Sequence, residues 1–259
     1  MTRLGLSVAL SLFSALPAGV FGQTSAGGTS AATPAAATGQ SAAPPAAELP
    51  DAPSVGAAPA PQPSGPTAVL DTSMGRITCK LFAKEAPEAV ANFIGLAEGT
   101  KDWTNPATHA RMHHRRFYDG TTFHRVIPEF MVQGGDPLGT GEGDPGYMFN
   151  DEFNPQLNFD VPGRLAMANS GPNTNGSQFF ITEVAVDHLN QHYSLFGQCD
   201  DAGVEVVKAI ARVPRDPQDK PLSNVVLNKV TIVREGQPMP AAPVIAAPAS
   251  PPGAPSTQP

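Results

Sequence analysis

The middle of the chain alternates between short apolar runs and clusters of Gly, Asn, Asp and Pro. Its first such stretch, TAVLDTSMGRITCKLF at 67–82, has two apolar-rich runs joined around Ser73, Met74 and Gly75, which predicts a β-hairpin. Six further runs have the length and composition of strands. They are TTFHRVI (121–127), FMVQG (130–134), RLAMA (164–168), QFFIT (178–182), YSLFGQC (193–199) and VVLNKVTIV (225–233).

Two segments have the 3.6-residue period of a helix instead. In the first, at 84–99, apolar side chains recur at Val90, Phe93 and Ala97, with a proline in the first turn and a glycine after the end. The second is AGVEVVKAIARV at 202–213. Many short strands with two helices predict a mainly β fold, a closed β-barrel capped by the helices.

The flanks of the chain lack this pattern. Of its 29 prolines, nine lie in Gln23–Pro66 and eight in Gly236–Pro259, and neither stretch contains an aromatic residue. Segments this rich in Ala, Pro, Ser and Gly cannot bury enough apolar surface to offset the entropy of ordering them. We therefore predict a disordered linker at 23–66, one folded domain at 67–235 and a disordered tail at 236–259.

Residues 1–22 have the pattern of a secretory signal peptide. Arg3 precedes a largely apolar stretch from Leu4 to Leu16, and Val20 and Gly22 can fill the −3 and −1 positions of a cleavage site. The stretch is too short to be a good membrane span, and an uncleaved anchor is the alternative. We expect an exported protein of the periplasm or cell envelope, or one secreted further, with no stable membrane insertion after cleavage.

The charge balance narrows the classes of partner. The chain carries a net charge of −7, and 67–235 carries −6 of it. Phosphate binding requires a basic face, so nucleic acid is not expected as an obligate partner. The one basic run, HARMHHRR at 109–116, is interpreted as a solvated loop. Its His109, His113 and His114 raise the alternative of a metal site, but no acidic or cysteine ligand stands beside them, so we expect no metal.

Cys79 and Cys199 are the two cysteines of the chain. Cys79 alternates with Ile77 and Leu81 along a predicted strand, which directs it inward. An exported protein could pair the two as a disulfide. Isolated cysteines are also common as small buried apolar residues, and the sequence leaves both interpretations open.

Two longer stretches mix polar and apolar residues in an unusual way. FHRVIPEFMVQGGD at 123–136 sets one Arg, one His and one Gln among apolar side chains, and MANSGPNTNGSQFFI at 167–181 is a fixed loop leading into a strand. Through them, and more loosely across 67–235, the chain resembles the cyclophilin family of peptidyl-prolyl cis-trans isomerases. The resemblance implies a closed eight-stranded antiparallel barrel with two helices. It also implies a monomer that acts on proline-containing peptides and on unfolded or folding polypeptides.

The resemblance assigns roles to residues at matching positions. The catalytic arginine falls on Arg125, with His124 beside it. The proline pocket falls on Phe130, Met131, Phe180 and Leu189. The residues that hold the peptide backbone fall on Gln133, Ala168, Asn169 and Gln178. Tyr193 stands where the family has a further pocket histidine. His188 stands where eukaryotic members usually have a tryptophan, which disfavours binding of cyclosporin-like inhibitors but not turnover.

An isolated arginine in an apolar wall suits this reaction, because no bond is made or broken and no nucleophile is needed. Amide resonance opposes rotation about the X-Pro bond with a barrier of roughly 18–20 kcal/mol. The twisted amide has a pyramidal nitrogen that can accept a hydrogen bond from a guanidinium, whereas the planar ground state offers no lone pair. No cofactor is expected.

Two other interpretations remain. The groove could bind proline-containing chains without catalysis, as a chaperone or scaffold module, although a binder has no need of a cation beside the rotating bond. The Pro-rich tails could themselves occupy the groove. Asn175-Gly176-Ser177 is also a formal glycosylation sequon, but the resemblance places it at the groove, where a glycan would obstruct binding, so we discount it.

Overall fold

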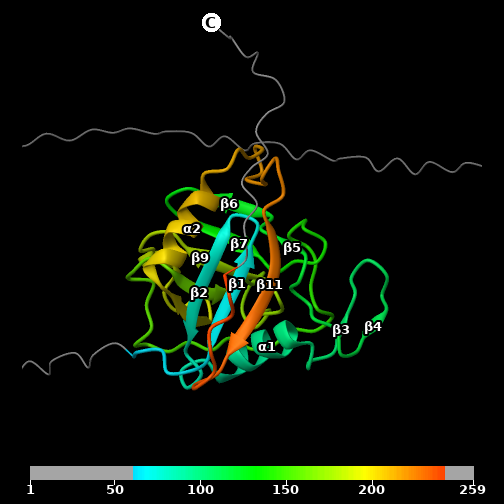
Figure 1. The fold of residues 1–259 in the computed structure, drawn as a ribbon, viewed down its shortest axis with the longest axis horizontal. Helices are drawn as coiled ribbons and strands as arrows, with labels where there is room; N and C mark the ends of the chain where they lie inside the picture. Colours follow the sequence, from blue (N-terminus) through cyan, green and yellow to red (C-terminus); the bar gives the residue numbers. More distant parts are fainter. Residues whose placement is uncertain (1–60, 243–259) are drawn as a thin grey trace, which may run out of the picture. The chain divides into compact units, whose positions relative to one another are not determined.

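The computed structural model describes residues 61–242, which form a mainly β fold with two α-helices (Figure 1). The main sheet comprises β1 (Thr67–Thr72), β2 (Gly75–Leu81), β5 (Thr121–Thr122), β6 (Arg125–Ile127), β7 (Met131–Gly134), β8 (Arg164–Met167), β9 (Phe179–Thr182), β10 (Leu195–Cys199) and β11 (Val226–Val233). The helices are α1 (Pro87–Glu98) and α2 (Asp201–Ala211), with a single 3₁₀ turn, η1 (Asp187–Leu189). The predicted signal peptide, most of the linker and the end of the tail lie outside the described residues.

The sheet corrects the closed eight-stranded barrel expected from the sequence. Nine strands pair antiparallel in the order β5-β11-β1-β2-β10-β8-β9-β7-β6. The single strand expected at 121–127 divides into β5, which pairs with β11, and β6, which pairs with β7. These two halves are the opposite ends of the sheet, and no ladder joins them within residues 61–242. The two ends meet through the continuous chain from β5 to β6 and through one isolated antiparallel bridge, between Thr122 of β5 and Asp136 beyond β7.

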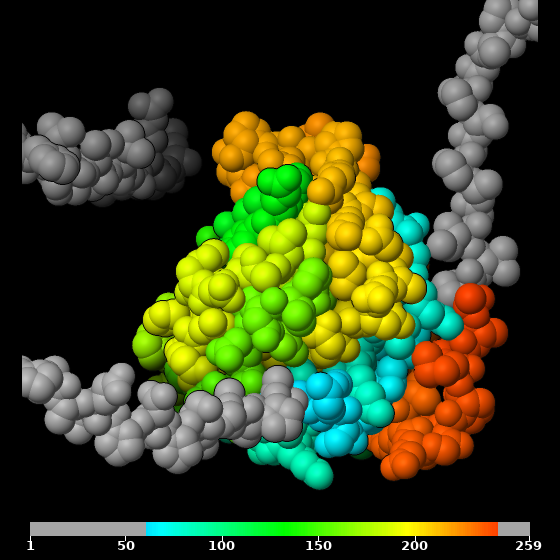
Figure 2. Space-filling view, turned by 90° about the vertical axis from the view of Figure 1, so that its left-hand side faces the viewer, coloured from blue at the N-terminus to red at the C-terminus, as the bar shows by residue number. Residues whose placement is uncertain are grey.

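Both predicted helices form, and each has an identifiable start. Pro87 occupies the first turn of α1, and the carboxylate of Glu152 accepts the backbone N–H groups of Glu88 and Ala89 at 2.9 and 2.7 Å. At α2 the side chain of Asp200 accepts the N–H of Gly203 at 2.7 Å. Both contacts satisfy donors that a helix start leaves unpaired. In the space-filling view the gold residues around α2 lie beside green and yellow residues from the middle of the chain (Figure 2).

The insertion at 101–116 forms a separate two-stranded ribbon of β3 (Trp103–Thr104) and β4 (Arg111–Met112). Trp103 attaches it to the domain, because its indole packs edge-on against Phe117 and donates to the carbonyl of Arg115 at 2.9 Å. His113 has an acidic partner that the local sequence did not indicate, since its Nδ1 lies 2.7 Å from the carboxylate of Asp102. Across residues 61–242 no group of three or more His, Cys, Asp or Glu side chains could hold a metal ion.

The cysteines are paired, which settles the question that the sequence left open. Cys79 on β2 and Cys199 on β10 are register partners, and a disulfide joins them across 120 positions of sequence. Both residues are buried in the main core. Ordered pairing also begins before the predicted domain start, because Gly65 donates to Leu81 and Leu81 donates to Pro66, at 2.9 and 3.0 Å. None of the helices in the described part of the chain is long and apolar enough to span a membrane.

Buried apolar side chains fall into two clusters. The larger one fills the interior between the two helices and the sheet, and includes Phe93, Tyr118, Phe179 and Phe196. The smaller one lies on the other face of strands β7, β8, β9 and β10, because alternate residues of these strands belong to the two clusters. It consists of Phe82, Met131, Leu157, Phe159, Ala166, Phe180, Val186, Leu189 and Leu195. Three residues of the smaller cluster were predicted from the resemblance to line a proline pocket.

Candidate active site

A cavity of about 190 Å³ opens where β6, β7 and β9 meet η1. Its lining residues are Arg125, Phe130, Met131, Gln133, Ala168, Asn169, Phe180, Leu189 and Tyr193. All of them belong to the set that the resemblance assigned to catalysis or substrate binding. We refer to this cavity as the proline pocket, after the role that the resemblance assigns to its apolar residues. Of the predicted set, His124 and Gln178 lie outside its lining.

Strand register brings three of these side chains into one row. Arg125 on β6 is opposite Gln133 on β7, and Gln133 is opposite Phe180 on β9. Directly opposed residues on adjacent strands point to the same face of a sheet and lie within contact distance. The row therefore places a cation, an amide and an aromatic ring along one wall, although Phe180 lies far from the other two in sequence.

The apolar wall belongs to the folded core. Met131, Phe180 and Leu189 are buried members of the smaller apolar cluster. Phe180 packs edge-on against Tyr193, with ring centroids 5.2 Å apart, and stacks on Phe159. Because each side chain is fixed from behind, the pocket keeps its shape without a ligand. Phe130 closes the rim, where its ring stacks on that of His188 at 5.9 Å.

Arg125 is exposed at the edge of this wall. Within residues 61–242 no hydrogen bond or ion pair occupies its guanidinium, whereas Arg76, Arg116, Arg164, Arg212, Arg215 and Arg234 each have a carboxylate partner. A guanidinium has five N–H donors and no acceptor. Those of Arg125 are available to a molecule in the pocket.

Gln133 is held in place by Gln178, which lines an adjoining cavity rather than the proline pocket itself. The Nε2 of Gln133 donates to the Oε1 of Gln178 at 3.0 Å. Gln178 in turn donates to the carbonyls of Gly141 and Gly143, both at 2.9 Å. With its oxygen committed to Gln133 and its nitrogen to the loop, Gln178 fixes the rotamer of Gln133, whose own carbonyl oxygen remains for a ligand.

Asp136 organises that loop, and the sequence interpretation missed it. It is fully buried, and its carboxylate accepts the backbone N–H groups of Leu138, Thr140 and Gly141 at 2.7, 2.9 and 2.6 Å. Burial opposes ionisation, but the backbone N–H groups outweigh it and lower the pKa of Asp136 below its ordinary value. A Cβ at Gly143 would lie 1.8 Å from the carboxylate, so only glycine fits there. The sequence did contain a signal for Asp136, because an acidic residue stands directly after two glycines at the end of a predicted strand.

His124 is buried and does not line the proline pocket. Within the described residues neither of its ring nitrogens has a hydrogen-bond partner. Burial lowers its pKa, which leaves the ring neutral at pH 7. His124 directly precedes Arg125 in the sequence, but its side chain is not among those that line the cavity. Its predicted contact with substrate stays a prediction.

Two further cavities adjoin the proline pocket. One, of about 270 Å³, shares Gln133, Ala168 and Asn169 with it and is also lined by Glu142 and Asp144. The other, of about 730 Å³, shares Asn169, Leu189 and Tyr193 and contains His188. All three cavities share Asn169, so together they form one continuous groove. Asn175 of the formal glycosylation sequon is fully buried, and its amide donates to Asp151 at 2.7 Å. In the folded protein this asparagine is therefore not accessible for attachment of a glycan.

Comparisons with known proteins identify the family of the folded part of the chain. Residues 67–232 match the family model described as cyclophilin type peptidyl-prolyl cis-trans isomerase/CLD. Over 167 residues the chain is 52% identical to peptidyl-prolyl cis-trans isomerase A of Mycobacterium tuberculosis, covering 64% of this chain and 91% of that protein. It is 50% identical to peptidyl-prolyl cis-trans isomerase B of Streptomyces anulatus, with 64% and 95% covered.

Solved structures show the same likeness. A cyclophilin-type isomerase of Cryptosporidium parvum superimposes with a TM-score of 0.56 at 34% identity, covering 65% of this chain and 97% of that one. The same protein determined in the presence of the dipeptide Ala-Pro also matches with a TM-score of 0.56, at 64% and 98% coverage.

Proposed function

This chain belongs to the cyclophilin-type peptidyl-prolyl cis-trans isomerase family, and we propose that Arg125 is the group with which it accelerates rotation of X-Pro bonds in exported proteins. The chain is a peptidyl-prolyl cis-trans isomerase. One observation supports this role of Arg125. Its guanidinium has no partner within residues 61–242 and lies at the edge of a preformed apolar pocket.

The geometry fits what the reaction requires. The apolar wall of Met131, Phe180 and Leu189 accepts the prolyl ring, which has no hydrogen-bond donor to satisfy. Gln133 and Asn169 hold the flanking peptide, so that rotation is confined to one bond. Arg125 donates to the prolyl nitrogen only once the amide has twisted. This interaction is stronger in the transition state than in the ground state, which is the condition for raising kcat.

Substrates are proline-containing peptides, in keeping with the family and with the Ala-Pro dipeptide present with the C. parvum relative. We propose unfolded and folding polypeptides as the physiological class, bound by a monomer. Neither nucleic acid nor a resident cofactor is part of the proposal, because the groove is lined by amides, apolar side chains and acids rather than by a basic surface.

Export is supported by two independent features. The sequence of residues 1–22 has the pattern of a secretory signal, and Cys79 is bonded to Cys199. Disulfides persist in oxidising compartments and are rare in the cytosol. We propose a mature protein of the periplasm or cell envelope that begins near Gln23. Sequencing the N-terminus of protein recovered from that fraction tests this, and an intact Met1 on soluble cytoplasmic protein would contradict it.

Measuring both the rate of isomerisation and the affinity for a proline peptide distinguishes catalysis from simple binding by the same groove. In a protease-coupled assay with a proline peptide, the native protein should accelerate isomerisation. Arg125→Ala should abolish most of the acceleration while peptide affinity, measured by titration, changes by less than about threefold, or about 0.7 kcal/mol. A native protein that binds the peptide without accelerating isomerisation would instead establish the chaperone or scaffold alternative.

A further inference from the structure

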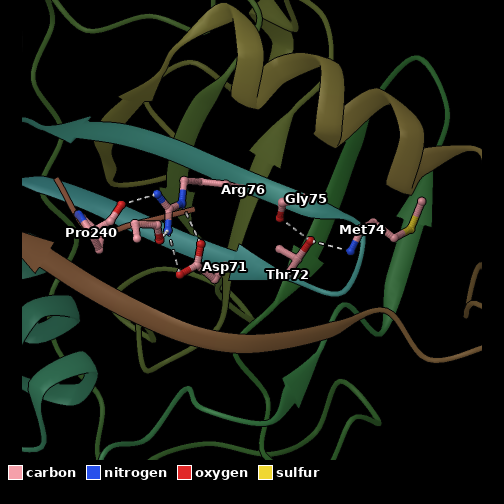
Figure 3. Close-up of polar contacts among 7 residues, drawn as sticks. Asp71, Thr72, Met74, Gly75, Arg76 and Pro240 are labelled. Carbon is pink, nitrogen blue, oxygen red and sulfur yellow. Dashed lines mark hydrogen bonds and ion pairs between the residues drawn. The ribbon is translucent and has the colours of Figure 1, made fainter. Parts of the chain in front are cut away.

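Arg76 and Asp71 form an ion pair on the hairpin of β1 and β2 (Figure 3). The two residues are register partners on adjacent strands. The Nε of Arg76 donates to Asp71 at 2.7 Å and its Nη2 donates at 3.2 Å. Both side chains are largely buried, with exposed fractions of 18% and 13%, so the guanidinium is held in a fixed orientation.

The remaining donors of Arg76 reach a distant part of the chain. Its Nη1 donates to the carbonyl of Pro240 at 2.7 Å and its Nη2 donates to the carbonyl of Ala241 at 2.6 Å (Figure 3). These residues lie beyond β11, in the segment predicted from composition to be a disordered tail. The contact is therefore a tertiary one that composition does not indicate.

A turn directs the chain to this contact. Gln237 donates its N–H to the carbonyl of Arg234 at 3.0 Å, and the Arg234 N–H donates to the Gln237 side chain at 2.9 Å. The guanidinium of Arg234 is bound by both carboxylate oxygens of Glu98 on α1, at 2.7 and 2.9 Å. The turn reverses the chain after β11, and the next residues return across the outside of the sheet to Arg76.

The chemistry of the two partners is complementary. A proline has no N–H, and an extended proline-containing chain makes no internal hydrogen bonds, so its carbonyls need outside donors. A guanidinium offers only donors, in a fixed fork. Asp71 compensates its charge and orients it, so that two donors face outward toward consecutive carbonyls. The ligand class that fits is an extended, proline-containing segment recognised through its backbone.

We propose that Asp71 and Arg76 form a docking site for this chain's own C-terminal segment, Pro238–Ala242. The site directs the tail outward over β1 and β2. Met131 and Gln133 of β7 line the proline pocket, and in the sheet order three strands, β10, β8 and β9, lie between β2 and β7. The first tail prolines are thereby kept away from the groove, which opposes the idea that they act as intramolecular ligands of the proline pocket.

Backbone ¹⁵N relaxation of the full mature protein tests the docking site. Met239, Ala241 and Ala242 have amide protons within the docked segment. Their order parameters should approach the rigid-backbone value of about 0.85 in the native protein and fall below about 0.6 in Arg76→Met. Order parameters below about 0.6 at Ala241 in the native protein would overturn the proposal without reference to any variant.

Arg215→Met is the matched control, because Arg215 also pairs with a single aspartate, Asp219, but makes no hydrogen bond to residues 238–242. It should leave the Ala241 signal unchanged, and an equal loss of order in both variants would refute a specific role for Arg76. Repeating the native measurement after tenfold dilution separates the chain's own tail from that of a second copy. An unchanged order parameter supports docking within one chain, and a fall on dilution contradicts it.

Discussion

Two arginines on different parts of the sheet are used in opposite ways. Arg76 on β2 is mostly buried and makes four hydrogen bonds, two to Asp71 and two to backbone carbonyls of the tail. Arg125 on β6 is exposed, and within residues 61–242 its guanidinium has no partner. A cation whose donors are mostly occupied by the protein contributes to structure. A cation whose donors are left open, beside a rigid apolar pocket, is available to a substrate.

The surroundings of the two arginines differ in the same sense. The β2 side is cross-linked to β10 by Cys79–Cys199 and rests on the larger apolar cluster. The groove side rests on the smaller apolar cluster, and three residues of that cluster, Met131, Phe180 and Leu189, also line the proline pocket. Changes on the first side should act on stability, and changes on the second should act on turnover.

The largest expected effect is on catalysis. Arg125→Ala should lower kcat/KM by about 100- to 1000-fold, equivalent to about 3–4 kcal/mol of transition-state stabilisation, because one donor to the twisted amide is lost. Its melting temperature should move by less than about 2 °C, since the side chain is exposed and the substitution removes no side-chain hydrogen bond or ion pair within residues 61–242. The protease-coupled assay and a thermal melt measure the two quantities.

Arg76→Ala is the matched control for this substitution. It should leave kcat/KM unchanged while lowering the free energy of unfolding by about 1–2 kcal/mol, since charged hydrogen bonds in a partly buried site are lost. If Arg76→Ala lowered turnover as far as Arg125→Ala did, the division between a structural and a catalytic arginine would be wrong.

Removing the cross-link should have the next largest effect. The double substitution Cys79→Ala and Cys199→Ala should lower the free energy of unfolding by about 2–4 kcal/mol, because the disulfide closes a long loop in the unfolded chain. Turnover at 25 °C should persist, since neither cysteine lies near the proline pocket lining. Urea unfolding measures the change. Reductant should destabilise the native protein and leave the double variant unaffected.

A smaller effect is expected from the loop behind Gln133. Asp136→Asn should lower kcat/KM by about tenfold, or about 1.4 kcal/mol, mainly through KM, because an amide cannot accept all the loop N–H groups that position Gln178 and Gln133. Asp200→Asn, which alters an aspartate that accepts a backbone N–H at α2, is the control and should leave KM unchanged.

The same carboxylate has a defined pH dependence. The pKa of Asp136 is lowered on folding, so its contribution to stability is complete above the unfolded value of about 3.9 and is lost as pH falls through the folded value. Urea unfolding between pH 6 and pH 3 should show the native protein losing its advantage over Asp136→Asn at the acidic end. A constant difference across this range would contradict the assignment.

The smallest effect is expected at the rim. His188→Trp should change kcat/KM by less than about twofold, or about 0.5 kcal/mol, because His188 stacks on Phe130 outside the proline pocket lining. Affinity for a cyclosporin-like inhibitor should increase, since the substitution restores the residue usual in eukaryotic members. Inhibitor titration against both proteins tests this, and a large loss of turnover would place His188 inside the catalytic site.

Much of the site could be predicted because its residues lie in two long stretches of sequence. The first contains Arg125, Met131 and Gln133, and the second leads into Phe180. Asp136 lies in the first stretch but was missed, because its partners are backbone N–H groups that carry no side-chain pattern. The single strand expected at 121–127 failed for a related reason, since its two halves pair with different strands that local periodicity does not identify.

By itself, the sequence determined the mainly β fold and the two helices, and its resemblance to the cyclophilin family indicated all the residues that line the proline pocket. Those features follow from periodicity and motifs that extend over a few to about fifteen residues. Only the tertiary structure decided that Cys79 bonds to Cys199, that Arg76 binds Pro240 and Ala241, and that the guanidinium of Arg125 has no partner among residues 61–242. Whether a polar group is satisfied depends on atoms that can lie more than a hundred positions away, and chain folding alone brings them together.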